Sequence, residues 1–304
     1  MIIVDEATGR IGNTFMEAVN VLAFAMETGQ TVINATLAPY ARYLSFFRNN
    51  LFCSYPSKIP LLISEDVSEK WMIRGKAERY LRRVMTRLGK LFQIETDFRR
   101  YPLIRLINNG VIKKYPNILL TGWLFDCPEL VEKHAETIRP LFQPVGSVVD
   151  AIDNPISQLR RESDIVFGLA IRQGDYARFE NGKYYFDLAS YRSLIVALAD
   201  LFPNKKVGFF IASEEKQPED AFRGIPNYLR SGHPVENIFT LSKCDYIVTV
   251  PSSFAHWAAF YGKSPVYYIE DIHKKPLLSD FKRNQDLYWP LVREPLPESS
   301  CLNI

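Results

Sequence analysis

Three residues that could form a ligand site follow directly on the most apolar strand signal in the chain. Residues 165–171 are wholly apolar, and Arg172, Gly174 and Asp175 come next. A strand without polar alternation is buried on both faces, as in a parallel sheet covered by helices. Ligands of such sheets bind outside the carboxyl ends of the strands, and the planar fork of arginine suits phosphate. The pattern fits a phosphate site with a tight exit at Gly174, and equally an arginine paired with a carboxylate at a strand end.

A second candidate phosphate site lies near the N-terminus. A strand at residues 2–5 precedes Gly9-Arg10-Ile11-Gly12-Asn13, and the apolar spacing then predicts a helix over residues 14–28 and a strand at 31–33. The two glycines let a ligand approach the backbone, and a helix start offers free N–H groups. The full dinucleotide fingerprint G-x-G-x-x-G is absent, so a plain tight turn is the alternative.

A third strand end combines a serine pair with a helix start. The strand at residues 245–250 is followed by Pro251, Ser252 and Ser253, a helix ending at Gly262, and a strand at 266–269. A serine at this place usually caps the helix. A helix N-terminus at the end of a buried strand also suits phosphate, and the two roles are compatible.

A fourth strand end is acidic. The strand at residues 207–212 ends in Ser213, Glu214 and Glu215. A carboxylate can accept hydrogen bonds from the N1–H and the amino group of guanine together, an edge that adenine and uracil do not present. The alternative is a solvated acidic exit from the strand.

The order of these residues resembles a known family. The run Ala170-Ile171-Arg172-Gln173-Gly174-Asp175-Tyr176 resembles the H-x-R-R-G-D-Y motif of the alpha-1,2-fucosyltransferases. Related forms occur in bacterial nodulation, alpha-1,6- and protein O-fucosyltransferases. The leading His is Ala170 here and the second Arg is Gln173. The arginine that binds the donor diphosphate in those enzymes aligns with Arg172.

Further segments match in the same order. The Gly9–Asn13 run resembles the family's G-R-x-G-N-Q loop, and residues 245–259 resemble its N-S-S-F-S-W-W-A-A segment. Residues 120–125 with 138–142 resemble G-Y-F-Q-S…I-R-x-x-F, and residues 212–215 resemble A-T-D-D, whose acid binds guanine in relatives. The resemblance covers about half of the chain, in separated islands.

The resemblance and the alternating strand and helix signals imply an α/β fold. We expect a GT-B-like architecture, in which two Rossmann-type domains with parallel sheets face each other across a cleft. Residues 1–145 would form the N-terminal domain on the acceptor side, and residues 146–304 the C-terminal domain that binds the nucleotide-sugar donor. Residues 140–155, with three prolines, one glycine and little periodicity, are the expected linker.

The family also implies a reaction, the inverting transfer of fucose from GDP-fucose to a glycan hydroxyl. Arg172 would bind the β-phosphate, beside Ser252, Ser253 and the helix that starts there. Gly12 and Asn13 would approach the donor from the other domain, and Glu214 or Glu215 would bind guanine. Asp175 would orient Arg172 or take the acceptor's proton.

Composition supports a globular protein without a resident metal. The chain has 304 residues, 47% of them hydrophobic, and no apolar run approaches the roughly 20 residues of a membrane span. The N-terminus leads straight into a strand, and the four cysteines are scattered. We therefore expect reduced thiols in the cytoplasm, although an even count leaves disulfides open. The four histidines are dispersed, with no H-E-x-x-H and no D-x-D, so we expect no metal and no cofactor beyond the donor GDP-fucose.

Charge is concentrated in one region. Residues 70–114 hold thirteen Lys or Arg against three acids. Much of the region has a helical apolar stripe, which consists of Trp71, Ile73, Tyr80, Leu81, Val84, Leu88 and Leu91. Such a region suits peripheral contact with anionic lipid or with an acceptor on a lipid pyrophosphate. A solvated helix face is the favoured alternative. Nucleic acid is not expected, because no recognised binding module accompanies the charge.

Two other functions compete with a fucosyltransferase. One is a GT-B enzyme that uses another nucleotide sugar, which an absence of guanine selectivity would reveal. The other is a non-catalytic nucleotide-sugar-binding protein of the same fold, suggested by the departures at Ala170 and Gln173.

Overall fold

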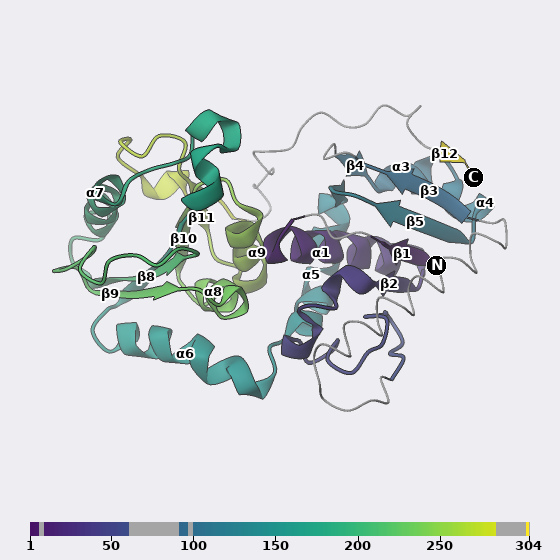
Figure 1. The fold of residues 1–304 in the computed structure, drawn as a ribbon, viewed down its shortest axis with the longest axis horizontal. Helices are drawn as coiled ribbons and strands as arrows, with labels where there is room; N and C mark the ends of the chain where they lie inside the picture. The colour runs from purple at the N-terminus through teal and green to yellow at the C-terminus, as the bar shows by residue number, and fades with distance from the viewer. Residues whose placement is uncertain (6–8, 61–90, 97–99, 284–301, 304) are drawn as a thin grey trace. The chain divides into compact units, whose positions relative to one another are not determined.

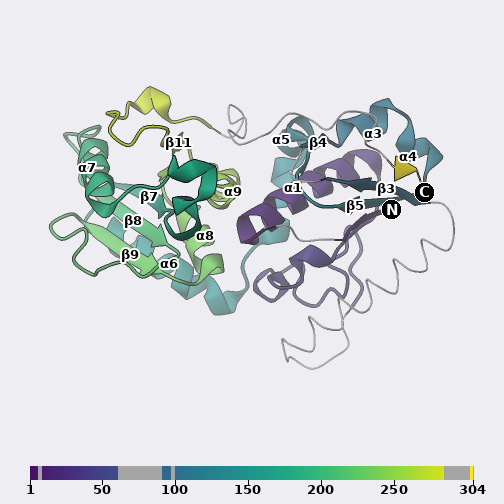
Figure 2. The same ribbon diagram turned by 45° about the horizontal axis from the view of Figure 1, so that its top comes forward.

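Two separate five-stranded sheets organise the chain. The computed structural model describes residues 1–5, 9–60, 91–96, 100–283 and 302–303. The chain divides into two compact units, Met1–Val145 with Val292–Ile304, and Gly146–Leu291. Both are α/β structures on largely parallel sheets, which confirms the expected fold class (Figures 1 and 2). The cleft between two facing domains stays a prediction.

The sheet of the first unit has the order β12-β3-β5-β1-β2. Its strands are parallel except β12, which pairs antiparallel with β3. They are β1 (Ile2–Val4), β2 (Val32–Asn34), β3 (Leu91–Glu95), β5 (Asn117–Thr121) and β12 (Leu302–Asn303). A short parallel pair, β4 (Tyr101–Pro102) and β6 (Phe125–Asp126), lies beyond the carboxyl ends of β3 and β5. The helices are α1 (Ile11–Thr28), α3 (Ile104–Asn108), α4 (Val111–Lys114) and α5 (Pro128–Ile138).

Helix α1 is the centre of the first unit. It begins at Ile11, three residues before the predicted start, so Gly12 and Asn13 lie in its first turn and not in a preceding loop. Gly29 ends the helix at φ 65°, the left-handed conformation that glycine adopts without strain. Almost the whole helix is buried, because the sheet, α5 and aromatic rings such as Phe142 surround it.

The structure corrects one part of the interpretation of the basic region at residues 70–114 and does not describe another. Leu91 was expected on a helical stripe, yet it begins strand β3, where it pairs with Asn117. The part of the basic region that was expected to carry the helical stripe, residues 70–90, lies outside the described residues.

The sheet of the second unit is wholly parallel, with the order β11-β10-β7-β8-β9. Strand β7 (Ile165–Ile171) has the predicted bounds. The others are β8 (Val207–Ser213), β9 (Asn227–Ser231), β10 (Tyr246–Thr249) and β11 (Val266–Tyr268). The helices are α6 (Gly146–Arg160), α7 (Leu188–Ala199), α8 (Pro234–Leu241) and α9 (Ser253–Gly262).

Helices cover both faces of this sheet, which explains why β7 is apolar throughout (Figure 1). Phe167, Leu169 and Ile171 form one core with α7. On the opposite face a side chain at Gly168 would collide with Leu241 of α8, and one at Gly208 would collide with Ser163 beyond α6. These two glycines therefore allow the close approach of α6 and α8.

Most of the predicted linker at residues 140–155 is helical, although the boundary between the two units, Val145 to Gly146, falls within it. Residues 139–142 form a short 3₁₀ turn, and Gly146 begins α6, which carries Pro155 inside it. The helix forms because Val148, Ile152, Ile156 and Leu159 bury one apolar stripe at helical spacing.

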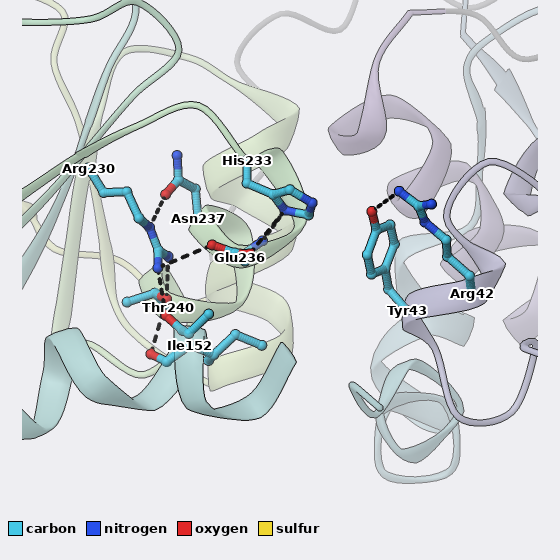
Figure 3. A network of polar contacts seen from close by, with 9 residues as sticks. Arg42, Tyr43, Ile152, Arg230, His233, Glu236, Asn237 and Thr240 are labelled. Atoms are coloured by element: carbon cyan, nitrogen blue, oxygen red, sulfur yellow. Dashed lines mark hydrogen bonds and ion pairs between the residues drawn. The ribbon is translucent and has the colours of Figure 1, made fainter. Parts of the chain in front are cut away.

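An arginine ties α6 to the rest of the second unit. Arg230 on β9 donates to the Ala151 carbonyl of α6 at 2.6 Å and to Asn237 and Thr240 of α8 at 2.6 and 2.7 Å (Figure 3). Its guanidinium also lies 5.2 Å from the centre of the Phe210 ring. Burial lowers the pKa of Arg230, and the Glu236 carboxylate, 3.7 Å from its Nη1, opposes that shift.

Candidate active site

The strand order of the second unit brings the candidate residues to one edge. Strand β7 is central, with β8 and β9 on one side and β10 and β11 on the other. In such sheets the ligand crevice opens at the carboxyl ends of the strands where the order reverses. Arg172 follows β7, Glu214 follows β8 and Ser252 follows β10, so all three leave the sheet at this edge.

Arg172 is held there by two carboxylates. Its Nη2 donates to Asp175 at 3.2 Å, and its Nη1 donates to Glu214 at 3.3 Å. The arginine side chain is 17% exposed, while both acids are about half exposed. Its Nε is buried without a hydrogen-bond partner in the described part of the chain. Arg172 is therefore paired with carboxylates, which was the alternative interpretation of the sequence. Its guanidinium still lies at the carboxyl edge of the sheet, where a ligand would bind.

Tyr176 connects Arg172 to the start of helix α9. The Arg172 guanidinium lies over its ring, 4.8 Å from the centroid. The phenol donates to the Pro251 carbonyl at 2.7 Å, directly before Ser252. Burial raises the pKa of Tyr176, and the neighbouring Arg172 opposes that shift. The sequence motif included Tyr176 but suggested no role; its place four residues after Arg172, in a 3₁₀ turn, was the available signal.

Ser252 and Ser253 occupy the expected helix start. Ser252 is the N-cap residue of α9, buried and in an extended conformation, and Ser253 is the first helical residue. The Ser252 side chain makes no capping hydrogen bond to α9. The first amides of this ten-residue helix are therefore not satisfied by the Ser252 hydroxyl.

Glu215 lies beside the turn that follows Arg172. A side chain added to Gly174 would come within 2.6 Å of the Glu215 Oε1 atom. Gly174 has φ +42°, so the tight exit predicted for this glycine is present. Glu214 and Glu215 are thus adjacent in sequence but contact different groups.

Gly12 and Asn13 belong to the first unit, in the first turn of α1. A side chain at Gly9, which has φ +87°, would lie 2.3 Å from Asn13 Nδ2. Gly9 therefore allows the Asn13 side chain to fold back over the start of the helix.

Comparison with known proteins identifies the fold. No protein-family model and no curated protein matches the chain. A mutant of Arabidopsis thaliana FUT1 in complex with GDP is similar with a TM-score of 0.51 and 12% identity, over 93% of this chain and 73% of that one. NodZ alpha-1,6-fucosyltransferase soaked with GDP-fucose is similar with a TM-score of 0.52 and 12% identity, over 92% and 96%. Fucosyltransferase NodZ from Bradyrhizobium has a TM-score of 0.51 and 14% identity, over 88% and 94%.

The chain has the same fold as these solved fucosyltransferases. Identities this low establish the fold, and the activity needs its own argument. The fold and the sequence motif nevertheless point to the same enzymes, although one is a property of the backbone and the other of a short run of residues.

Within this fucosyltransferase fold, the two departures from the motif have local structural roles. Ala170 is buried near the end of β7. Gln173 donates to the Phe186 carbonyl at 3.0 Å and accepts from Gln217 at 3.0 Å, and Gln217 also donates to Ser213 at 2.9 Å. A neutral chain of hydrogen bonds thus fastens the turn after β7 to the turn after β8.

Among the residues that the structure describes, no three His, Cys, Asp or Glu side chains gather in a way that could hold a metal ion. No helix in those ranges has both the length and the apolarity to cross a membrane. Cys127 and Cys244 are buried free thiols, and Cys53 is buried as well.

Proposed function

We propose that the protein is an inverting glycosyltransferase that moves fucose from GDP-fucose to a glycan hydroxyl. The observation that carries this proposal is the placement of Arg172 at the ligand edge of a fucosyltransferase fold, beside the start of α9. The second unit would bind the donor, and the first unit, with Gly12 and Asn13, would approach it from the acceptor side.

The mechanism follows from the charges that develop. Departure of GDP builds positive charge on the sugar and negative charge on the β-phosphate. A preorganised cation and helix-end amides stabilise that negative charge, so no step of the proposal requires a metal. Arg172, Ser252 and Ser253 have this role. The diphosphate would replace the carboxylates that pair with Arg172 in the donor-free protein.

Asp175 is proposed to orient Arg172. Its carboxylate already accepts from the guanidinium at 3.2 Å, which supports orientation over the alternative role as the base that takes the acceptor's proton. The acceptor is proposed to be a glycan or a lipid-linked glycan. Peripheral membrane contact through residues 70–114 remains part of the proposal.

Calorimetry with GDP, UDP and ADP tests the donor. We expect GDP to bind far more tightly than UDP or ADP, with the same affinity in the presence of a chelator. Equal affinities for the three nucleotides would favour a GT-B enzyme with another donor, and binding lost in the chelator would contradict the metal-free mechanism. Tight GDP-fucose binding with neither hydrolysis nor transfer would favour the non-catalytic protein, with Gln173 in place of the motif's second arginine as its basis.

A further inference from the structure

Tyr176 contacts both elements that are proposed to hold the diphosphate. The Arg172 guanidinium lies over its ring, 4.8 Å from the centroid. Its hydroxyl, at the outer end of the ring, donates to the Pro251 carbonyl at 2.7 Å. Pro251 directly precedes Ser252, the N-cap residue of α9. A single side chain, only 7% exposed, therefore connects the arginine after β7 with the helix that follows β10.

The ring contact of Arg172 differs in kind from its two ion pairs. Asp175 and Glu214 are about half exposed, and they accept from the guanidinium at 3.2 and 3.3 Å. A bound diphosphate would take their place, because it needs the same N–H groups. A cation over an aromatic ring is attracted by the ring without giving up an N–H group. The contact with Tyr176 therefore persists when the diphosphate displaces both carboxylates.

The hydroxyl contact fixes the second element. Strands β7 and β10 are neighbours, and Thr249 pairs with Ala170, but each chain then leaves the sheet in its own turn. Pro251 and Ser252 are buried there, so the Pro251 carbonyl needs a partner within the protein. Tyr176 supplies that partner from the turn that carries Arg172. The rigid ring thus sets the distance between Arg172 and the start of α9.

We propose that Tyr176 is a positioning residue for the transfer reaction, whose ring keeps the Arg172 guanidinium in place after the donor binds and whose hydroxyl sets the start of α9 beside it. This inference rests on the proposed function. Donors that are already in position stabilise the leaving-group charge without reorganising as it develops. Loss of Tyr176 contacts should therefore lower kcat more than it raises KM.

Two substitutions separate the ring from the hydroxyl, with GDP-fucose hydrolysis by the full chain as the assay. Tyr176→Phe keeps the ring and leaves the Pro251 carbonyl without its partner, so kcat should fall about tenfold. Tyr176→Leu also removes the cation–π contact, and kcat should fall by about a further tenfold. GDP affinity, measured by calorimetry, should change by about threefold or less in both variants.

The difference between these two variants should depend on Arg172. In an Arg172→Ala background, Tyr176→Phe and Tyr176→Leu should give the same kcat, because the ring then has no guanidinium to hold. The same tenfold difference in both backgrounds would show that the ring only supports the fold, and would overturn the role assigned to it.

Tyr268→Phe is the matched control. The Tyr268 hydroxyl lies 2.7 Å from Nδ1 of His256 in α9, so this substitution also removes a hydrogen bond to the same helix. Tyr268→Phe and Tyr176→Phe should both lower the free energy of unfolding in urea, and only Tyr176→Phe should lower kcat.

The inference is overturned if Tyr176→Phe keeps the wild-type kcat, or if Tyr268→Phe lowers kcat equally. Should Tyr176→Leu fail to fold, Tyr176→Phe and its control decide. A wild-type protein that neither binds GDP nor hydrolyses GDP-fucose contradicts the proposed function and this inference with it, whereas equal hydrolysis by the wild type and Tyr176→Phe contradicts this inference alone.

Discussion

The charged pairs at the carboxyl edge of the second unit and the buried polar groups inside the first unit differ in how far a ligand could replace their present contacts. In the second unit, Arg172 is paired with two half-exposed carboxylates that a ligand can replace. In the first unit, several polar side-chain atoms are buried with no hydrogen-bond partner among the described residues. They include both carboxylate oxygens of Glu17, the hydroxyls of Thr96 and Thr121, and the indole nitrogen of Trp123.

This difference distinguishes groups that can take part in ligand binding from groups that only reduce the stability of the fold. Exposed ion pairs contribute little to stability, so exchanging them for a diphosphate is inexpensive. Buried unpaired polar groups destabilise the fold and are not reached by solvent. We therefore propose that the donor binds in the second unit, and we expect the buried polar groups of the first unit to affect mainly stability.

The largest expected effect is on turnover, through Arg172. A cation where leaving-group charge develops stabilises the transition state more than the bound donor. Arg172→Ala should lower donor hydrolysis by about a hundredfold or more while GDP-fucose binding falls modestly. Arg172→Lys should not restore the rate, because lysine lacks the bidentate fork. Hydrolysis without acceptor is the assay, since it does not require knowing the acceptor.

Arg160 is the matched control. It makes a bidentate ion pair with Asp245 at 2.6 Å, next to the amino end of β7 and away from the ligand edge. Arg160→Lys should leave hydrolysis unchanged. Near wild-type hydrolysis in Arg172→Ala would show that the site is assigned wrongly.

The sequence predicted an element well where a short contiguous run of residues determines it. Strand β7 was predicted with its observed bounds because its apolar run is bordered by Asp164 and Arg172. Helix α6 was missed because residues 140–155, with three prolines and one glycine, were interpreted as a linker with little periodicity, although Val148, Ile152, Ile156 and Leu159 carry the helical spacing.

The hydrogen-bond partners of the site residues could not be predicted from the sequence, because they depend on which strands are neighbours in the sheet. Glu214 lies 42 residues beyond Arg172, and the two meet only since β7 and β8 are adjacent. The seat of Glu215 on Gly174 depends on the same pairing. Likewise, a glutamate at position 17 gives no local sign of burial, which results from the packing of α1 among the sheet and α5.

A smaller effect, on stability, is expected at Glu17. Burial raises its pKa well above the ordinary 4.5. Below about pH 4.5 the carboxyl is protonated in the folded and the unfolded chain alike. As the pH rises, the unfolded chain ionises first, so native stability falls until the folded pKa is passed. Glu17→Gln should therefore raise the free energy of unfolding at pH 7–8 by about 1–3 kcal/mol and flatten its decline with pH.

Glu27 in the same helix provides the contrast. It is exposed, and Lys133 and His134 lower its pKa. Glu27→Gln should give no stabilisation at neutral pH. Urea unfolding at several pH values measures both variants, and a Glu17→Gln protein that loses activity while keeping its stability would instead give this acid a role in catalysis.

The smallest effect is expected at Gly9, and it tests whether Asn13 takes part in the reaction. Gly9 and Gly29 both have left-handed backbones, with φ +87° and +65°, so alanine at either should cost about 1 kcal/mol of strain. A β-carbon at Gly29 meets nothing within 4 Å, whereas one at Gly9 would lie 2.3 Å from Asn13 Nδ2 and displace that side chain. Equal loss of stability in the two variants, with donor hydrolysis reduced only in Gly9→Ala, would support a donor contact by Asn13. Equal hydrolysis in both would restrict the donor chemistry to the second unit and remove Asn13 from the proposed site.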